Sequence, residues 1–166
     1  MKYCSNCGKE VADNAVVCVH CGCRLDAYPS GAGMMRLKTN RSLLKYIFLS
    51  LITLGIYGLV VMSVISDDIN TIASRYDGKK TMHYCLVVFL FSWLTLGIVP
   101  LVWYHRLSDR VGDELKRRGI NYPISSSSFW GWYILGALII VGPFVYYHKL
   151  FTGMNYLCEN FNRAGI

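Results

Sequence analysis

The chain has 166 residues, of which 54% are hydrophobic and 16% are charged, and its formal net charge is +7. This length suits one ordinary domain, or a small domain joined to a membrane unit. All of the surplus positive charge lies after residue 27, beside three long apolar runs, whereas the preceding residues balance. Basic residues in that position favour anionic lipid headgroups over nucleic acid as partners, and the polar N-terminal region argues against a cleavable signal peptide.

Two C-x-x-C-G motifs lie near the N-terminus, at residues 4–8 and 18–22. This spacing lets two tight turns direct four thiolates at one tetrahedral ion, and the glycines permit the left-handed backbone of such turns. A unit this small builds too little core to fold alone, so metal binding would supply most of its folding energy. Disulfides or a thioredoxin-like redox pair are the alternatives, but redox motifs usually occur singly and near a βαβ pattern. We predict a structural zinc ion held by Cys4, Cys7, Cys18 and Cys21.

This N-terminal segment resembles the short zinc-ribbon family found at the N-terminus of many bacterial membrane and regulatory proteins. The resemblance extends from Tyr3 to Leu25 and rests on the two motifs and the closing Gly-x-x-Leu at residues 22–25. Val19 stands where that family often has proline. His20 and Cys23 are predicted to be bystanders, and replacement of a ligand by either is the alternative.

Thiolate ligation implies a reducing compartment, so the ribbon is predicted to face the cytoplasm. The ribbon lacks the basic footprint of a nucleic-acid reader, which favours a protein partner or simple stabilisation of the terminus. Residues 27–40 contain Pro29, Gly31 and Gly33 without periodicity and predict a flexible linker. The predicted domains are therefore a zinc ribbon at 1–26, this linker, and a membrane domain at 41–166.

The membrane domain is predicted from three apolar runs, at 46–66, 84–104 and 129–147. At about 1.5 Å per residue, each is long enough to cross a hydrocarbon core of roughly 30 Å. Thr53–Ile56 superimposes on Thr95–Ile98 at an offset of 42, and a further offset of 43 places His105–Leu107 on His148–Leu150. These offsets predict three tandem repeats, at about 41–78, 82–119 and 125–165.

Each repeat is predicted to hold an apolar helix, a break at glycine or proline, and an amphipathic helix. Beyond the first break, Ile65, Ile69 and Ile72 share a helix face that is typical of helix packing or of a membrane surface. The predicted fold class is thus an all-α integral membrane domain of three tandem helix–break–amphipathic-helix repeats, with a small four-cysteine zinc ribbon at its N-terminus.

The repeats resemble a bacterial family of small membrane proteins that carry a domain of unknown function, with a recurrent Thr-Leu-Gly-Ile-Tyr motif. Residues 53–57 match this motif fully, residues 95–98 match four of its five positions, and the third copy keeps only the glycine. The likeness extends over about residues 41–165. It implies an integral membrane protein and assigns no activity.

Two topologies are compatible with these runs. If each run crosses the membrane fully, the protein is a multi-pass protein of the cell inner membrane with a cytoplasmic N-terminus, and basic residues are more numerous on the inner flanks. Alternatively, each copy enters the membrane and returns at its break, which leaves every polar segment on one side and requires protein to shield the irregular backbone. The apolar lengths favour full crossing.

No catalytic constellation is evident, so the chain is predicted not to be an enzyme. Asp67, Asp68 and Asp109 are interpreted as solvated helix surface. The basic pairs His105-Arg106 and His148-Lys149 occupy matched places in two copies and are candidate contacts for lipid headgroups, with generic anchoring beside interfacial aromatics as the alternative.

The favoured function is a small integral membrane protein in an interaction, regulatory or scaffold role, whose zinc ribbon contacts a protein partner. The alternative is a channel, transporter or lipid-handling protein that works as a homo-oligomer. A membrane-tethered enzyme or nucleic-acid sensor is the third hypothesis. The absence of charge within the apolar runs argues against a transporter made of one chain.

Overall fold

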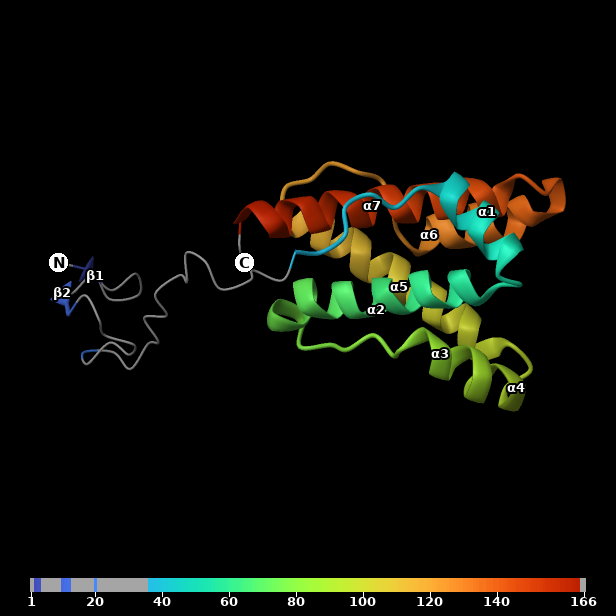
Figure 1. Cartoon of the computed structure of the whole chain (residues 1–166), viewed down its shortest axis with the longest axis horizontal. Helices are drawn as coiled ribbons and strands as arrows, with labels where there is room; N and C mark the ends of the chain where they lie inside the picture. The colour runs from blue at the N-terminus through green and yellow to red at the C-terminus, as the bar shows by residue number, and fades with distance from the viewer. Residues whose placement is uncertain (1, 4–9, 13–19, 21–35, 165–166) are drawn as a thin grey trace. The chain divides into compact units, whose positions relative to one another are not determined.

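The computed structural model describes residues 2–3, 10–12, 20 and 36–164, and the chain divides into two compact units, Met1–Met35 and Arg36–Ile166 (Figure 1). In the first unit, β1 (Lys2–Tyr3) pairs antiparallel with β2 (Glu10–Val11). The register places Lys2 opposite Val11 and Tyr3 opposite Glu10. These two short strands flank the first predicted metal-binding motif in the sequence.

In residues 36–164 the chain folds into three helical hairpins, each with a short helix followed by a longer one. Hairpin 1 consists of α1 (Leu43–Ile52) and α2 (Ile56–Asp77). Hairpin 2 consists of α3 (Tyr84–Leu86), the π-helical η1 (Val87–Phe91) and α4 (Ser92–Leu94), which are continuous, followed by α5 (Ile98–Arg117). Hairpin 3 consists of α6 (Ser126–Ser128), the π-helical η2 (Phe129–Ile134) and the 3-10 helix η3 (Leu135–Ile139), followed by α7 (Gly142–Ala164). The three hairpin turns lie at the same end of the bundle, on the right in Figure 1.

The long helices α2, α5 and α7 contact one another in pairs and enclose the core. Their central positions are fully buried, at Ile65, Leu107 and Leu150, and one turn further along at Ile69, Val111 and Met154. The predicted apolar face of the first amphipathic helix is therefore confirmed as a packing face. Burial of side chains of this size stabilises the bundle by roughly 1.5–3 kcal/mol each.

Three connecting segments lie against the long helices: the first connector (residues 36–42), the second (78–83) and the third (119–125). In the first connector, the backbone of Arg41 and of Leu37 pairs with the side-chain amides of Asn155 and Asn162 on α7. Each asparagine both accepts from the backbone N–H and donates to the carbonyl of the same residue, over 2.9–3.1 Å. Leu37 of the predicted linker is thus buried and bonded to α7, and residues 27–35 lie outside the described residues.

The other two connectors are held in comparable ways. Asn70 of α2 accepts from the Thr81 N–H at 2.7 Å and donates to its carbonyl at 2.8 Å. In the third connector, the backbone of Ile124 lies so close to Gly112 of α5 that a Cβ on this glycine would overlap the Ile124 carbonyl oxygen. Each connector therefore depends on the residue type that faces it from a long helix.

The breaks that the sequence predicts within the three apolar runs are present in the structure, so each run is divided between two helices. The chain leaves the helical path at residues 53–55, 95–97 and 140–141, and each run contributes to both helices of a hairpin. The predicted breaks are therefore chain reversals. Pro100 and Pro143 lie in the first turn of α5 and α7, where proline does not interrupt a helix.

Candidate functional site

The turn of hairpin 1 is built by the Thr-Leu-Gly motif. The Thr53 hydroxyl donates to the Leu49 carbonyl at 2.7 Å and accepts from the Tyr57 N–H at 2.9 Å. One side chain therefore caps both the end of α1 and the start of α2. Leu54 and Gly55 both have positive φ, 49° and 92°, and together they reverse the chain. Glycine adopts this backbone readily, whereas leucine does so at a cost in free energy.

The turn of hairpin 2 has the same construction. Thr95 donates to the Phe91 carbonyl at 2.6 Å and accepts from the Val99 N–H at 3.2 Å, and Leu96 and Gly97 have φ of 50° and 86°. The recurrent Thr-Leu-Gly-Ile sequence is therefore the sequence of a helical hairpin turn. The third turn differs, with a single positive φ of 62° at Ile140.

An apolar surface surrounds these turns. The side chains of Leu54 and Leu96 are 94% and 95% exposed, and the backbone of both residues is strained by a positive φ. Exposed apolar side chains around them come from all three hairpins: Leu44, Phe48, Leu51, Ile52, Ile56, Phe89, Leu90, Trp93, Leu94, Ile98, Leu135, Leu138, Ile139, Ile140 and Val141. We call this surface the apolar end. Soluble monomers rarely expose so much contiguous apolar surface unless it contacts a partner or a membrane.

A layer of tyrosines lies beneath the apolar end. The Tyr104 hydroxyl is 2.9 Å from that of Tyr84 and 3.1 Å from that of Tyr147, and the ring of Tyr46 lies 5.1 Å from that of Tyr147. All three hairpins contribute to this cluster, in which the hydroxyls of hairpins 2 and 3 bond to one another. Such pairing removes the penalty for burying polar groups next to an apolar surface.

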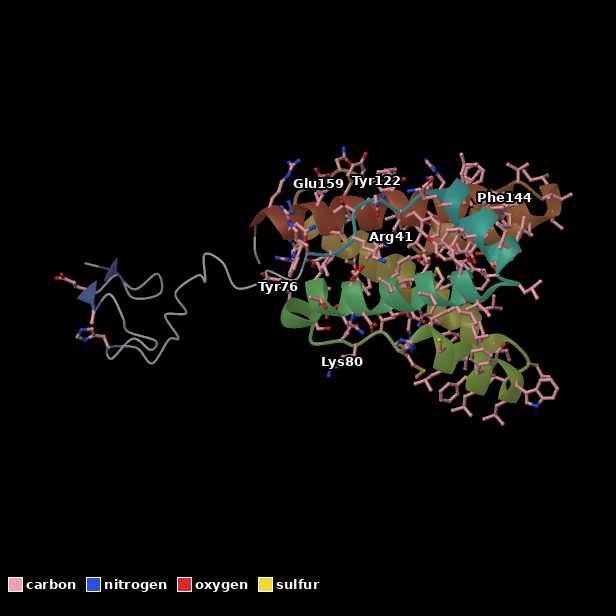
Figure 2. The ribbon with its side chains drawn as sticks, viewed as in Figure 1. Arg41, Tyr76, Lys80, Tyr122, Phe144 and Glu159 are labelled. Atoms are coloured by element: carbon pink, nitrogen blue, oxygen red, sulfur yellow. The ribbon has the colours of Figure 1, made fainter. Side chains whose placement is uncertain are left out.

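The opposite part of the bundle is polar and holds several ion pairs. Arg110 of α5 binds both carboxylate oxygens of Asp77 and also donates to Asn70 and Thr81, which fixes the second connector. Figure 2 places Phe144 near the hairpin turns and Tyr76 and Glu159 toward the other end. The bundle is thus divided into an apolar end and a polar end.

Asp68 does not occupy the solvated surface that the sequence suggested. Its carboxylate is buried and paired with Arg41 of the first connector, whose guanidinium also reaches Cys158 of α7. The partner lies 27 residues earlier in the chain, outside the local range that the helical interpretation considered. Asp109 accepts from the Ser126 N–H at 2.7 Å, at the start of the short helix of hairpin 3.

Glu114 is a buried carboxylate of α5 that links Arg117, the last residue of this helix, and Arg118, which follows it. It accepts from Arg117 at 2.7 and 2.8 Å and from Arg118 at 2.7 Å. Burial opposes its ionisation, yet the hydrogen bonds and charges of Arg117 and Arg118 prevail and lower the pKa of Glu114. Because the folded-state pKa is lowered, the stabilisation is complete above about pH 4.3, the unfolded value, and is lost as the pH falls through the folded-state value.

We expect an E114Q variant to unfold at neutral pH with a free energy lower by about 1–3 kcal/mol, because hydrogen bonds to a charged carboxylate are lost. The difference from the wild type should shrink below about pH 4, where the wild-type carboxylate also becomes protonated. Chemical unfolding in detergent measures both effects. The matched control is E159Q, since Glu159 and Arg163 form an exposed pair that is worth less than about 0.5 kcal/mol. An equal loss for both variants at every pH would contradict the argument.

The predicted lipid-contact residues do not converge on one site. His105 accepts from the Trp130 indole N–H at 3.1 Å and lies 3.6 Å from Asp109, so its contacts are with the protein. Arg106 is exposed and lines a cavity beside the second connector. His148 is exposed, and Lys149 lines a different cavity beside the third connector.

The four predicted zinc ligands, Cys4, Cys7, Cys18 and Cys21, lie outside the described residues, as does Cys23. His20 is described and lies exposed in a turn. Among the described residues, no group of three or more histidine, cysteine or acidic side chains could hold a metal ion.

Sequence reasoning missed the residues that hold the connectors, although a signal was available. Asn70, Gly112 and Asn155 are related by the same offsets of 42 and 43 residues that relate the hairpin turns. All three face the backbone of a connector, two through an amide and one through the absence of a side chain. Arg110, which also bonds to the second connector, left no comparable signal.

Within the described residues, one helical stretch, Ile56–Ser74, has the length and composition of a membrane-crossing helix, and half of it is buried in the bundle. A core helix of a soluble bundle meets the same criteria. The apolar helices Leu43–Ile52 and Tyr84–Leu94 are shorter.

Comparison with known families supports a two-part architecture. Residues 3–25 match a zinc-ribbon domain, and residues 41–113 match a domain of unknown function (DUF4234). The first match suggests zinc binding, and the second extends over hairpin 1 and most of hairpin 2 without assigning an activity. No curated protein and no solved structure matches the chain.

Proposed function

We propose that residues 41–164 anchor the protein in a membrane by inserting the three hairpin turns into one leaflet, and that the N-terminal zinc ribbon binds a protein partner at the membrane surface. The observation that carries this proposal is the gathering of exposed apolar side chains from all three hairpins at one end of the bundle. The protein would thus be a non-enzymatic scaffold or regulatory anchor of the cytoplasmic face of a bacterial inner membrane.

The dimensions of the hairpins support insertion into one leaflet. The short helix α1 has 10 residues. It is therefore about 15 Å long, which is close to half of a hydrocarbon core of roughly 30 Å. The reversal at Leu54–Gly55 exposes few unpaired backbone groups. The Thr53 hydroxyl bonds to the backbone on both sides of the turn, and the Ser50 carbonyl accepts from the Gly55 N–H. A membrane tolerates such a turn when its polar groups are paired within the protein.

The three hairpins are also proposed to be tandem copies of one unit. The offsets of 42 and 43 residues relate the fully buried Ile65, Leu107 and Leu150, one from each long helix. Two copies share their turn geometry in detail. A unit of this kind buries its apolar stripe only against its neighbours, so three copies would form the smallest closed bundle.

Topology distinguishes this proposal from full crossing. A protease-recognition sequence inserted after Lys80 should be cut from the cytoplasmic side of inverted vesicles, because the second and third connectors both lie at the polar end. The matched insertion after Asn121 should be cut from the same side. Full crossing predicts that only the Lys80 insertion faces outward, so cleavage of that site exclusively in intact spheroplasts would overturn the one-leaflet arrangement. Recovery of the wild type in the soluble fraction would overturn membrane anchoring itself.

Zinc content tests the ribbon. We expect one zinc ion per purified chain, and a loss of that zinc in C7S and C21S variants, because a four-thiolate site has no spare ligand. The C23S variant is the control and should keep its zinc. Since the helical unit is separate, chelation should leave its thermal transition unchanged. Zinc loss in C23S, or zinc retention in C7S, would contradict the assigned ligands.

A further inference from the structure

A cavity of about 970 Å³ lies between the second connector and α5. Toward the apolar end it is lined by valines, Val87, Val99 and Val102. Lys80 and Arg106, both exposed, lie along the same cavity, and Figure 2 shows Lys80 at the outer edge of the bundle. The indole of Trp103 donates to the Met82 carbonyl at 2.8 Å, which holds the connector that forms one wall.

Three of the cations that line this cavity, Lys79, Lys80 and Arg106, are left without an ion pair among the described residues. Asp77 is bound by Arg110, and Glu114 is bound by Arg117. Asp109 and Asp113 also line the cavity. Asp109 lies 3.6 Å from His105 and accepts from the Ser126 N–H, and Asp113 lies two helical turns beyond Arg106, toward the polar end.

We infer that this cavity binds an anionic phospholipid, whose phosphate contacts Lys80 and Arg106 and whose acyl chain lies along Val99 and Val102. The inference rests on the proposed membrane insertion. Arg106 lies eight residues after Ile98, the first residue of α5. It is therefore roughly 12 Å from the turn along the helix axis, near the depth at which a leaflet of about 15 Å meets its headgroups.

The apolar wall distinguishes a lipid from a free phosphate ion. A small anion would use only the cations and would leave the valines in contact with water, whereas a phospholipid matches both parts. The equivalent cavity of hairpin 1 is smaller, at about 400 Å³, and Val64 occupies the position that corresponds to Arg106. Selective binding is therefore expected at hairpin 2.

The test uses full-length protein in vesicles of phosphatidylcholine, with and without a minor fraction of phosphatidylglycerol. Native mass spectrometry after mild extraction counts the retained lipids. A K80Q/R106Q variant should bind phosphatidylglycerol about 10- to 30-fold more weakly than the wild type. A control R36Q/K45Q variant removes the same charge near hairpin 1 and should change the affinity by less than about twofold. A V102W variant, which fills the cavity and keeps both cations, should also lose the lipid.

The outcomes separate this inference from the proposed function. Insertion into phosphatidylcholine without selective retention of phosphatidylglycerol would overturn the lipid site and leave the anchor standing. Failure to insert into either vesicle would overturn the anchor. Equal losses of phosphatidylglycerol affinity in K80Q/R106Q and R36Q/K45Q would show that binding depends on a general basic surface, which would overturn the site. Binding of inorganic phosphate that survives in V102W would overturn the lipid as occupant.

Discussion

An L54D/L96D variant is expected to leave the membrane fraction. Both leucines are almost fully exposed at the hairpin turns, and under the proposed insertion both lie in the hydrocarbon. An aspartate at the centre of a membrane helix costs about 2.5–3.5 kcal/mol, so two cost about 5–7 kcal/mol, or roughly four to five powers of ten in partitioning. Sedimentation after a carbonate wash measures the release.

The same variant should remain folded, because neither leucine packs in the core. Aspartate also tolerates positive φ better than leucine does, which favours the turn. Thermal unfolding in detergent should therefore match the wild type. The control is T39D/T71D, which adds the same charge at exposed positions of the first connector and of α2. Retention of L54D/L96D in the membrane, or equal release of T39D/T71D, would contradict insertion of the turns.

The breaks in the apolar runs could be predicted from the sequence, and a reversal at each break was one of the two topologies considered, but the sequence did not decide between reversal and crossing. A glycine after Thr-Leu is compatible with a kinked crossing helix and with a reversal. The difference lies in the backbone of Leu54 and Leu96, which adopt positive φ although leucine rarely does. Nothing in a leucine predicts that conformation, and the apolar lengths favoured crossing because they were counted through the turn.

The long-range ion pairs of the bundle could not be predicted from the sequence. The pairing of Asp68 with Arg41 depends on how the first connector packs between α2 and α7, and short-range patterns carry no information about that packing. By contrast, the equivalence of Asn70 and Asn155 follows from offsets that are visible in the sequence. The local turn chemistry and the regular spacing of equivalent residues could thus be predicted from the sequence, whereas the long-range ion pairs could not. The four-cysteine site was predicted from spacing, and its residues lie outside the described part of the chain.

A G112A variant is expected to destabilise the bundle strongly. A Cβ at this position would overlap the Ile124 carbonyl oxygen, and the obstacle is backbone that cannot rotate away. Ile124 is itself buried, so the third connector would have to shift as a unit away from α5. Overpacking of this kind costs about 1–3 kcal/mol and more where backbone must move, and we expect about 3 kcal/mol.

The matched control for this variant is G131A, in η2, where an added Cβ meets nothing within 4 Å. Replacing glycine by alanine within a helix gains up to about 1 kcal/mol, and both variants share that gain. The difference between them therefore isolates the contact with the third connector, and it should reach roughly 3–4 kcal/mol in free energy of unfolding in detergent. If G112A and G131A unfolded alike, the third connector could not lie against α5, and the equivalence of Asn70, Gly112 and Asn155 would lose one of its three members.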